Sequence, residues 1–350
     1  MEQSAWWKGP VKAEPDFRNL LKVLRREVPE RPTLFEFFLN DRLHAELIGP
    51  GIESLKQQPH GWMLSRLYAF RNAGYDYVTV NVPEFGFPTG NRAKAKTISQ
   101  NEGGIIHDRA TFEAYAMPDP AKAGYSVFDA LAKHLPDGMQ MIACGPCGVL
   151  ENVTFLTGFD NLCYLIADDE ALACELFEAV GSRLVDFYAR CVTHPRVGAI
   201  IGNDDWGFKT QPMLSPADMR RFVIPWHRKL VAVAHAAGKP AILHSCGNLA
   251  TLMDDIIDDV GYDGKHSYED AILPVEQAYD AYGRRIAIMG GLDLDFMCRS
   301  TPQQVYNRAR RMLEHSAALG GFALGTGNSV PEYVPSENYF AMIRAVLETR

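Results

Sequence analysis

Short apolar segments alternate with amphipathic helical segments along most of this chain, and this alternation limits the possible folds more than any other feature. The expected strands are Thr33–Phe38, Tyr77–Val82, Met141–Cys144, Ala199–Asn203, Ala241–His244, Gly264–Ser267, Ile286–Met289 and Phe322–Leu324. The expected helices are His60–Ala73, Ala167–Cys191, Pro216–Ala237, Leu249–Val260, Pro274–Ala281, Pro302–Ala318 and Glu337–Leu347. Strands that alternate with helices form parallel sheets, and eight such units predict an α/β fold of the (β/α)8 barrel type.

Local signals support these helix boundaries. Ser215-Pro216 and Thr301-Pro302 each combine a capping hydroxyl with a proline in the first turn, which is typical of a helix start. Gly238 and Gly320 follow helical segments and are typical of helix ends. The alternative fold is an open doubly wound sheet, but no Gly-x-Gly-x-x-Gly turn follows the first expected strand. The barrel is therefore the favoured architecture.

The length predicts one domain with two additions. A barrel of this type takes roughly 250 residues, and the chain has 350. We assign the remainder to an N-terminal arm, residues 1–30, and to an insertion after strand two, residues 83–138. The insertion is rich in glycine and polar residues, and we expect it to form a lid or rim.

Composition excludes several classes of protein. The net charge of −8 and the lack of a basic block argue against nucleic-acid binding. The seven cysteines are scattered, which suits a reducing compartment. No apolar run approaches the roughly 20 residues that a membrane span requires. We expect a cytoplasmic protein with no nucleic-acid or membrane partner.

The tripeptide His244-Ser245-Cys246 ends a short apolar strand and is the first candidate for chemistry. Side chains at positions i and i+2 of a strand point to the same face, so the imidazole and the thiol emerge side by side. These groups are preferred ligands of zinc. The alternative is a buried cysteine beside a hydrogen-bonded histidine, which is common in protein cores.

Polar side chains follow nearly every expected strand. They are Glu36, Asn81, Cys144, Cys147, Asn203, Asp204, Asp205, His266, Glu269, Asp270, Asp293, Asn328 and Ser329. Active sites of barrels lie at the carboxyl ends of the strands, so we expect these groups to share one polar mouth. Adjacent residues of a strand face opposite ways, so we expect at most one of Asp204 and Asp205 to face the mouth and one of them to cap the following segment. Cys144 and Cys147 are read as structural thiols, since no helix start that would lower a thiol pKa is evident.

Several motifs together resemble one protein family. They are Asp204-Asp205-Trp206-Gly207, Leu214-Ser215-Pro216, His244-Ser245-Cys246-Gly247-Asn248, Gly290-Gly291-Leu292-Asp293, Gly325-Thr326-Gly327-Asn328 and Pro335-Ser336-Glu337-Asn338. With them the chain resembles the uroporphyrinogen decarboxylase superfamily, and its corrinoid-dependent methyltransferase branch more than the true decarboxylases. The resemblance extends from about the fourth expected strand to the C-terminus, and it also implies a TIM barrel.

The resemblance implies a zinc ion held by a His-x-Cys pair, here His244 and Cys246, and one further ligand. Coenzyme M methyltransferases have a cysteine near the last strand, where this sequence has Thr326. We expect a carboxylate to complete the site, with Glu269 as first choice, then Asp205 or Asp293. Asp205, Glu269 and Asn328 are the predicted catalytic residues, with Asn328 orienting the reactants through hydrogen bonds.

The function implied is zinc-dependent methyl transfer between a corrinoid protein and a small molecule. The small molecule is either a donor, such as a methyl ether or a methylamine, or an acceptor, such as a thiol or tetrahydrofolate. A partner protein would supply the methylcorrinoid, since the chain has no corrinoid-binding Asp-x-His-x-x-Gly motif.

Two alternatives stay open. The first is decarboxylation of a tetrapyrrole, against which the segment Arg31–Glu36 lacks the arginine-rich motif of the decarboxylases and Thr326 replaces their histidine. The second is a non-catalytic barrel that binds a small molecule, which the missing last-strand ligand would support.

Overall fold

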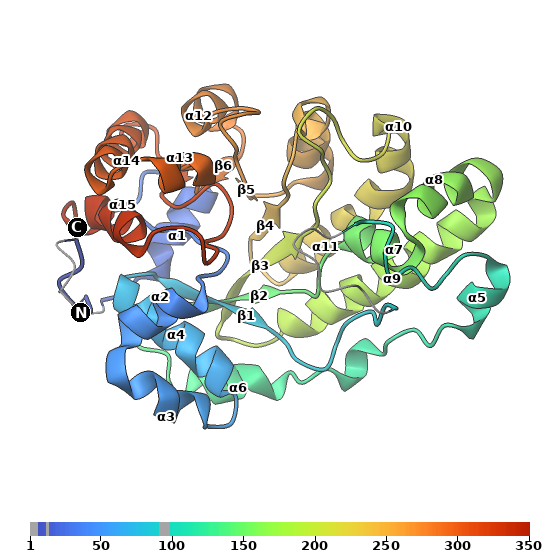
Figure 1. Cartoon of the computed structure of the whole chain (residues 1–350), viewed down its shortest axis with the longest axis horizontal. Helices are drawn as coiled ribbons and strands as arrows, with labels where there is room; N and C mark the ends of the chain where they lie inside the picture. Colours follow the sequence, from blue (N-terminus) through green and yellow to red (C-terminus); the bar gives the residue numbers. More distant parts are fainter. Residues whose placement is uncertain (1–5, 12–13, 91–98) are drawn as a thin grey trace.

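The computed structural model of this chain describes residues 6–11, 14–90 and 99–350. Its core is a parallel sheet in the order β1 to β7 (Figure 1). The strands are β1 (Tyr77–Asn81), β2 (Gln140–Cys144), β3 (Val197–Asn203), β4 (Ala241–His244), β5 (Gly264–His266), β6 (Ala287–Met289) and β7 (Phe322–Ala323). Every neighbouring pair is parallel, and the strands are buried almost throughout, as expected when helices cover a parallel sheet. The expected α/β class is confirmed.

The first expected strand, Thr33–Phe38, is not a regular strand. Leu34 forms an isolated parallel bridge with Leu324, which joins this segment to the chain just after β7. On its other side the segment contacts β1 through side chains, since the hydroxyls of Tyr77 and Thr79 donate to the carbonyls of Glu36 and Phe37, each over 2.7 Å. Because side-chain hydroxyls take the place of backbone donors there, the regular ladder has seven strands rather than the eight expected.

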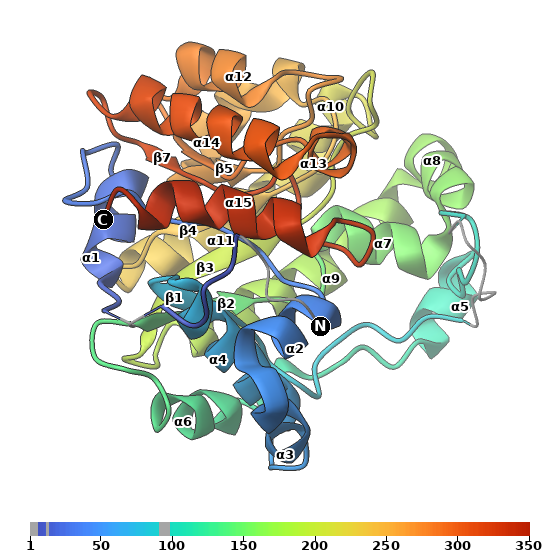
Figure 2. The same ribbon diagram turned by 60° about the vertical axis from the view of Figure 1, so that its left-hand side comes forward.

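Helices pack around the sheet, as Figures 1 and 2 show from two directions. They are α1 (Phe17–Leu24), α2 (Asp41–Ile48), α3 (Ile52–Lys56), α4 (Gly61–Ala73), α5 (Arg109–Ala114), α6 (Ser126–Ala132), α7 (Val149–Thr157), α8 (Phe159–Asp168), α9 (Glu170–Cys191), α10 (Pro216–Asp218), α11 (Ile224–Ala236), α12 (Val275–Tyr282), α13 (Leu294–Arg299), α14 (Pro302–Ser316) and α15 (Ser336–Leu347). The predicted starts are confirmed, since Ser215 caps α10 and Thr301 caps α14.

Three expected helices are divided. Ala167–Cys191 is interrupted at Asp169, whose side chain caps the start of α9 by accepting from Leu172 N. In Pro216–Ala237 the π-helical turn Met219–Val223 lies just before Pro225, which has no N–H to continue the α-helical bonding. Leu249–Val260 forms the 3-10 turn Ala250–Leu252 and the π-helical turn Asp255–Val260.

The insertion between β1 and β2 contains α5, the 3-10 turn Pro120–Lys122 and α6. The amide nitrogens of Ile105 and Ile106 donate to the carbonyl of Leu156 in α7, and Arg109 binds Glu175 of α9 through two hydrogen bonds of 2.9 and 2.8 Å. Residues 105–109 of the insertion therefore pack against α7 and α9, and α5 lies at the edge of the molecule (Figure 1). Its role as a lid stays a prediction.

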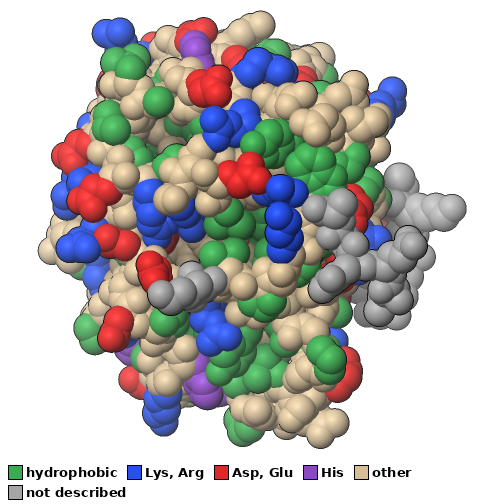
Figure 3. Space-filling view, turned by 90° about the vertical axis from the view of Figure 1, so that its left-hand side faces the viewer, with side chains coloured by type: hydrophobic (Ala, Val, Ile, Leu, Met, Phe, Trp, Pro, Cys, Tyr) green, Lys and Arg blue, Asp and Glu red, His purple; other side chains and the backbone are tan. Residues whose placement is uncertain are grey.

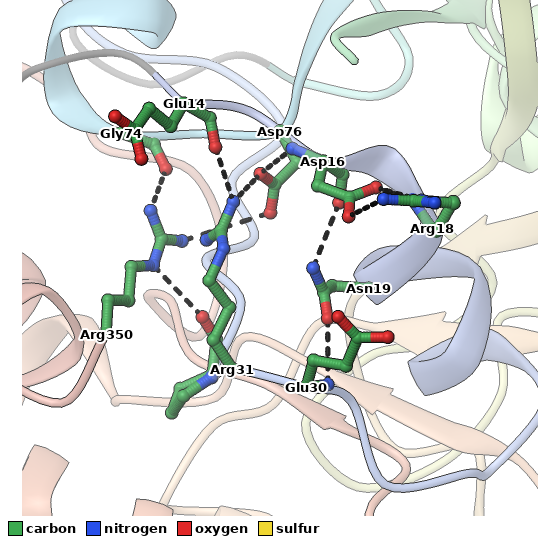
Figure 4. A network of polar contacts seen from close by, with 10 residues as sticks. Glu14, Asp16, Arg18, Asn19, Glu30, Arg31, Gly74, Asp76 and Arg350 are labelled. Atoms are coloured by element: carbon green, nitrogen blue, oxygen red, sulfur yellow. Dashed lines mark hydrogen bonds and ion pairs between the residues drawn. The ribbon is translucent and has the colours of Figure 1, made fainter.

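A polar network joins the N-terminal arm to β1 and to the end of the chain (Figure 4). Asp76, directly before β1, accepts from Arg31 over 2.5 Å and from the backbone N of Asp16 over 2.8 Å. Arg350 donates to the carbonyls of Gly74 and Pro32 over 2.5 and 3.1 Å. The network lies at the amino end of β1, and thus at the opposite end of the sheet from the polar strand ends.

The face shown in Figure 3 has Lys and Arg side chains beside Asp and Glu side chains, with hydrophobic groups between them. No helix within the described ranges is both long enough and apolar enough to cross a membrane.

Candidate metal centre

The ends of β3 and β4 bring three potential metal ligands together. Asn203 is the register partner of His244, so the residues that follow β3 lie beside those that follow β4. Ligand atoms of Asp205, His244 and Cys246 all lie within 4.8 Å of one another. His244 is buried, and the other two side chains are partly exposed. We call these three residues the metal cluster.

Hydrogen bonds determine which nitrogen of His244 faces the cluster. Its Nδ1 lies 2.8 Å from Nδ1 of His266, and Nε2 of His266 lies 3.2 Å from the carbonyl oxygen of Thr326. A carbonyl only accepts, so Nε2 of His266 carries the proton and Nδ1 of the same neutral ring accepts from His244. Nε2 of His244, which lies 4.0 Å from the Cys246 sulfur, then has a free lone pair. That is the form of histidine that binds a metal ion.

Burial keeps both rings neutral. It lowers the pKa of His244 well below its usual value, and the neighbouring His266 and Lys265 lower it further. Burial also lowers the pKa of His266 to about 3. At neutral pH the ring protons therefore lie on Nδ1 of His244 and on Nε2 of His266.

Cys246 is held by three neighbours. Its backbone N donates to Oδ1 of Asp205 over 2.8 Å, which connects two members of the cluster. Its sulfur accepts from Nδ2 of Asn328 over 3.1 Å and from Oγ of Ser267 over 3.6 Å. Burial, followed by the charge of Asp205, raises the pKa of the thiol to about 12. A cation in the cluster would favour the thiolate instead.

Asp204 and Asp205 have different roles. Asp204 is fully buried, and its carboxylate accepts from the amides of Leu150 and Glu151 over 3.0 and 2.9 Å at the start of α7. It also accepts from the indole N of Trp206 over 3.0 Å and lies 2.8 Å from Nε2 of His227. Asp204 thus holds α7 and the loop after β3 in place, while Asp205 faces the cluster.

Glu151, in the first turn of α7, has no counterpart among the sequence predictions. Its Oε2 is buried without a hydrogen-bond partner among the described residues. Burial raises its pKa well above the usual range, and the charges of Asp205 and Asp204 raise it further. Burial also raises the pKa of Asp205. Only the packing of α7 against the loop after β3 brings these carboxyls together, so no sequence motif could have revealed Glu151.

Not all predicted site residues join the cluster. Glu269 lies outside it and lines, with Asn328 and Asp293, a hollow of about 780 Å³. Asp293 caps α13 by accepting from Phe296 N over 2.9 Å. Asn328 reaches the cluster through its hydrogen bond to Cys246.

Thr326 lies outside the metal cluster and is hydrogen-bonded to Glu36. Its backbone N and its hydroxyl lie 2.6 and 2.8 Å from the two carboxyl oxygens of Glu36.

Cys144 and Cys147 form no disulfide, and burial raises the pKa of Cys144 to about 12, which does not favour a reactive thiolate.

The chain is similar to known proteins in sequence and in fold. A methylated-thiol–coenzyme M methyltransferase from Methanosarcina mazei is 34% identical over 142 residues, which cover 39% of this chain and 35% of that protein. A uroporphyrinogen decarboxylase from Syntrophotalea carbinolica is 29% identical over 160 residues, which cover 45% of this chain and 44% of that protein. The chain thus matches less than half the length of these relatives.

A solved methyltransferase structure from Methanosarcina mazei superimposes with a TM-score of 0.70 and 16% identity, covering 94% of this chain and 97% of that one, and shows a shared fold. The family model described as uroporphyrinogen decarboxylase (URO-D) matches residues 90–349. The resemblance found in the sequence is confirmed, and the chain belongs to the URO-D family.

Proposed function

We propose that this protein is a zinc-dependent methyltransferase that moves a methyl group between a corrinoid protein and a small molecule. The observation that carries the proposal is the metal cluster, where Asp205, His244 and Cys246 meet at the strand ends. The similarity to a methylated-thiol–coenzyme M methyltransferase supports methyl transfer as the reaction.

The donor set fits zinc. One imidazole nitrogen, one sulfur and one carboxylate oxygen lie within 4.8 Å of one another, and zinc accepts all three types of ligand. Catalytic zinc sites typically have three protein ligands and leave one position for a reactant. Asp205 replaces Glu269 as our choice for the third ligand, because Asp205 lies in the cluster.

The residues around the cluster have distinct tasks in this proposal. Zinc bound there would act as a Lewis acid toward the oxygen or sulfur of a small molecule. His266 keeps the Nε2 lone pair of His244 directed at the cluster, and Asn328 holds the sulfur of Cys246 through its hydrogen bond. The hollow of about 780 Å³ beside Asn328 offers room for reactants, and their alignment for transfer at carbon would provide much of the rate.

The corrinoid would come from a separate protein. The sequence lacks the Asp-x-His-x-x-Gly motif that binds a corrinoid. The hollow is lined by residues from the segments after β3, β5, β6 and β7, so it lies at the strand ends, next to the metal cluster. A corrinoid protein docked over this end could bring its methyl group to the cluster.

The test combines metal content with transfer. We expect about one zinc per chain in the wild-type protein, loss of zinc in Cys246→Ser, and retention in Cys174→Ser, whose cysteine is exposed on α9. Transfer to or from a small molecule is measured with methylcobalamin or reduced cobalamin as the corrinoid probe. Circular dichroism verifies that each variant is folded. Wild-type protein that takes up no zinc even from excess would refute the proposal and favour a non-catalytic binding protein.

Decarboxylation of a tetrapyrrole is the competing activity, because several relatives are uroporphyrinogen decarboxylases. In this chain Arg31 is engaged with Asp76 at the amino end of β1, far from the strand ends that hold the cluster. We therefore expect no release of carbon dioxide from uroporphyrinogen. Turnover of uroporphyrinogen that persists in Cys246→Ser would identify a decarboxylase instead.

A further inference from the structure

A second cavity, of about 180 Å³, lies beside the metal cluster. It is formed by the loop after β4, the segment after β5 and nearby helical turns. Apolar side chains make up most of its wall, among them Leu249, Ala250, Met253, Ile272 and Leu273. An apolar cavity of about 150 Å³ can bind benzene, so this cavity has room for a small molecule built on one such ring.

The charges in the cavity wall balance one another. Lys265 of β5, the basic residue of the wall, donates from Nζ to the carbonyls of Ser267 and Ser245 over 2.6 and 3.4 Å. Its ammonium also lies 4.4 Å from the ring of Tyr268. The negative charge of Glu269, which lines the same wall, stabilises the ammonium further. Since both charges are already engaged within the chain, the wall favours an uncharged ligand over an ion.

The hydroxyl of Tyr268 is the polar group that a ligand could satisfy. The side chain is 6% exposed, and its buried hydroxyl has no hydrogen-bond partner among the described residues. Tyr268 lines this cavity and also the larger hollow beside Asn328. A buried hydroxyl without a partner is costly, and a ligand oxygen that accepts from it would offset that cost.

We infer that this cavity binds an uncharged small molecule with an apolar body and one acceptor oxygen, which accepts a hydrogen bond from the hydroxyl of Tyr268. The apolar body would be buried against Leu249, Met253 and Leu273, which adds a favourable hydrophobic contribution. Carboxylates, sulfonates and protonated amines are disfavoured, because each would lose hydration of its charge without gaining a free opposite charge in the wall.

The cavity adjoins the metal cluster. Ser267 lines the cavity, and its hydroxyl lies 3.6 Å from the sulfur of Cys246. Gly247 and Asn248, which follow Cys246 in the chain, line it too. If the proposed function holds, on which this one step rests, the ligand is the small-molecule reactant. A methyl ether then fits best, because it is uncharged and has such an oxygen, whereas a methylamine is protonated at neutral pH and tetrahydrofolate has carboxylates.

The binding test uses four probes of similar size, which are anisole, toluene, benzoate and benzylammonium. Each is titrated by calorimetry into the full chain, both as purified and after a chelator has removed metal, so that binding is measured without transfer. We expect anisole to bind roughly tenfold or more tightly than either ion. It should bind about threefold to tenfold more tightly than toluene, as one net hydrogen bond would give. Removal of metal should leave these ratios unchanged.

Two pairs of variants locate the binding. Tyr268→Phe should lower the affinity for anisole to that for toluene without changing the affinity for toluene, and Tyr164→Phe, at an exposed tyrosine of α8, is its control. Leu273→Trp should fill the cavity and abolish binding of both probes. Leu319→Trp, at an exposed leucine outside the cavity wall, should bind both like the wild type.

Equal affinity for anisole and benzoate, or unchanged anisole affinity in Leu273→Trp, would overturn the inference. Equal affinity of the wild type for anisole and toluene would overturn it as well, and this comparison stands even if Tyr268→Phe fails to fold. Absence of methyl transfer with anisole binding as expected would count against the proposed function alone and leave the cavity assignment standing.

Discussion

Glu36 and Thr326, which are 290 positions apart in the chain, are joined by two hydrogen bonds. The backbone N of Thr326 lies 2.6 Å from one carboxyl oxygen of Glu36, and its hydroxyl lies 2.8 Å from the other. This connection fixes the segment before β1 to the segment after β7. Thr326, which the family resemblance places at the position of the last-strand ligand, therefore has a structural role here.

The buried carboxyl of Glu36 predicts a pH-dependent stability. Burial raises its pKa from 4.5 to about 8, although the hydrogen bonds from Thr326 lower it in part. The folded state thus holds this proton more tightly than the unfolded state. The stabilisation that protonated Glu36 adds to the free energy of unfolding is fully present below pH 4.5 and is lost progressively as the pH rises to about 8. At about 1.4 kcal/mol per pKa unit, the rise in the pKa of Glu36 from 4.5 to about 8 corresponds to a change on the order of 5 kcal/mol.

Glu36→Gln cannot lose this proton, and its amide can still hydrogen-bond to Thr326. We expect the variant to be more stable than the wild type at pH 8 to 9 and to show a smaller decline between pH 5 and 8, measured by urea unfolding. Glu53→Gln, on exposed α3, should follow the wild-type profile. Parallel profiles for wild type and Glu36→Gln would show that Glu36 ionises normally.

The sequence predicts elements well where the signal is local. The strand Ala241–His244 has its predicted bounds, because an apolar run ends at a Gly-containing loop. The first expected strand, Thr33–Phe38, does not form a regular strand, because its contacts with β1 are made by side chains, which strand propensity does not describe.

The site residues likewise divide into those placed by local sequence and those placed by the packing of distant segments. His244 and Cys246 are two residues apart, so strand geometry alone places them side by side. The position of Asp205 depends on the register of β3 against β4, and the contact between His244 and His266 on the register of β4 against β5. Register is a tertiary property, so the sequence favoured Glu269 where the structure brings Asp205 to the cluster.

His266 should control metal affinity without touching the metal. His266→Leu leaves the Nδ1 proton of His244 without an acceptor and frees the ring to turn, so we expect zinc affinity to fall about 10- to 100-fold. His266→Asn places an amide oxygen near the position that Nδ1 of His266 occupies in the wild type, so this variant should retain most of the zinc affinity. Competition with a chromogenic chelator measures both. Equal losses in the two variants would show that His266 acts through packing alone.

The third ligand can be identified by a matched pair of amide substitutions. Asp205→Asn keeps an oxygen that accepts from the backbone N of Cys246 but removes the charged ligand, so zinc affinity should fall at least tenfold. Glu269→Gln, outside the cluster, should change the affinity by less than about threefold, within the usual context dependence of a remote charge. A larger loss of zinc affinity in Glu269→Gln than in Asp205→Asn would identify Glu269 as the third ligand instead.

Asp204 should matter for folding rather than for chemistry. Asp204→Ala leaves two amides of α7 and the Trp206 indole without their acceptor in a fully buried environment. We expect a loss of about 3–5 kcal/mol in the free energy of unfolding, because a buried charged partner is removed while its donors remain. Asp204→Asn keeps one acceptor oxygen and should lose less. Asp137→Ala, at an exposed position, should stay within about 0.5 kcal/mol of the wild type.

The informative comparison is zinc affinity in the folded fraction of Asp204→Ala. Asp204 supports the loop after β3 from behind, whereas Asp205 faces the cluster, so folded Asp204→Ala should bind zinc more tightly than Asp205→Asn does. If Asp204→Ala is as stable as the wild type but cannot bind zinc, the roles of Asp204 and Asp205 are the reverse of those described here. In that case the hydrogen bonds to α7 would contribute little to stability, and the carboxylate that completes the cluster would have to be Asp204.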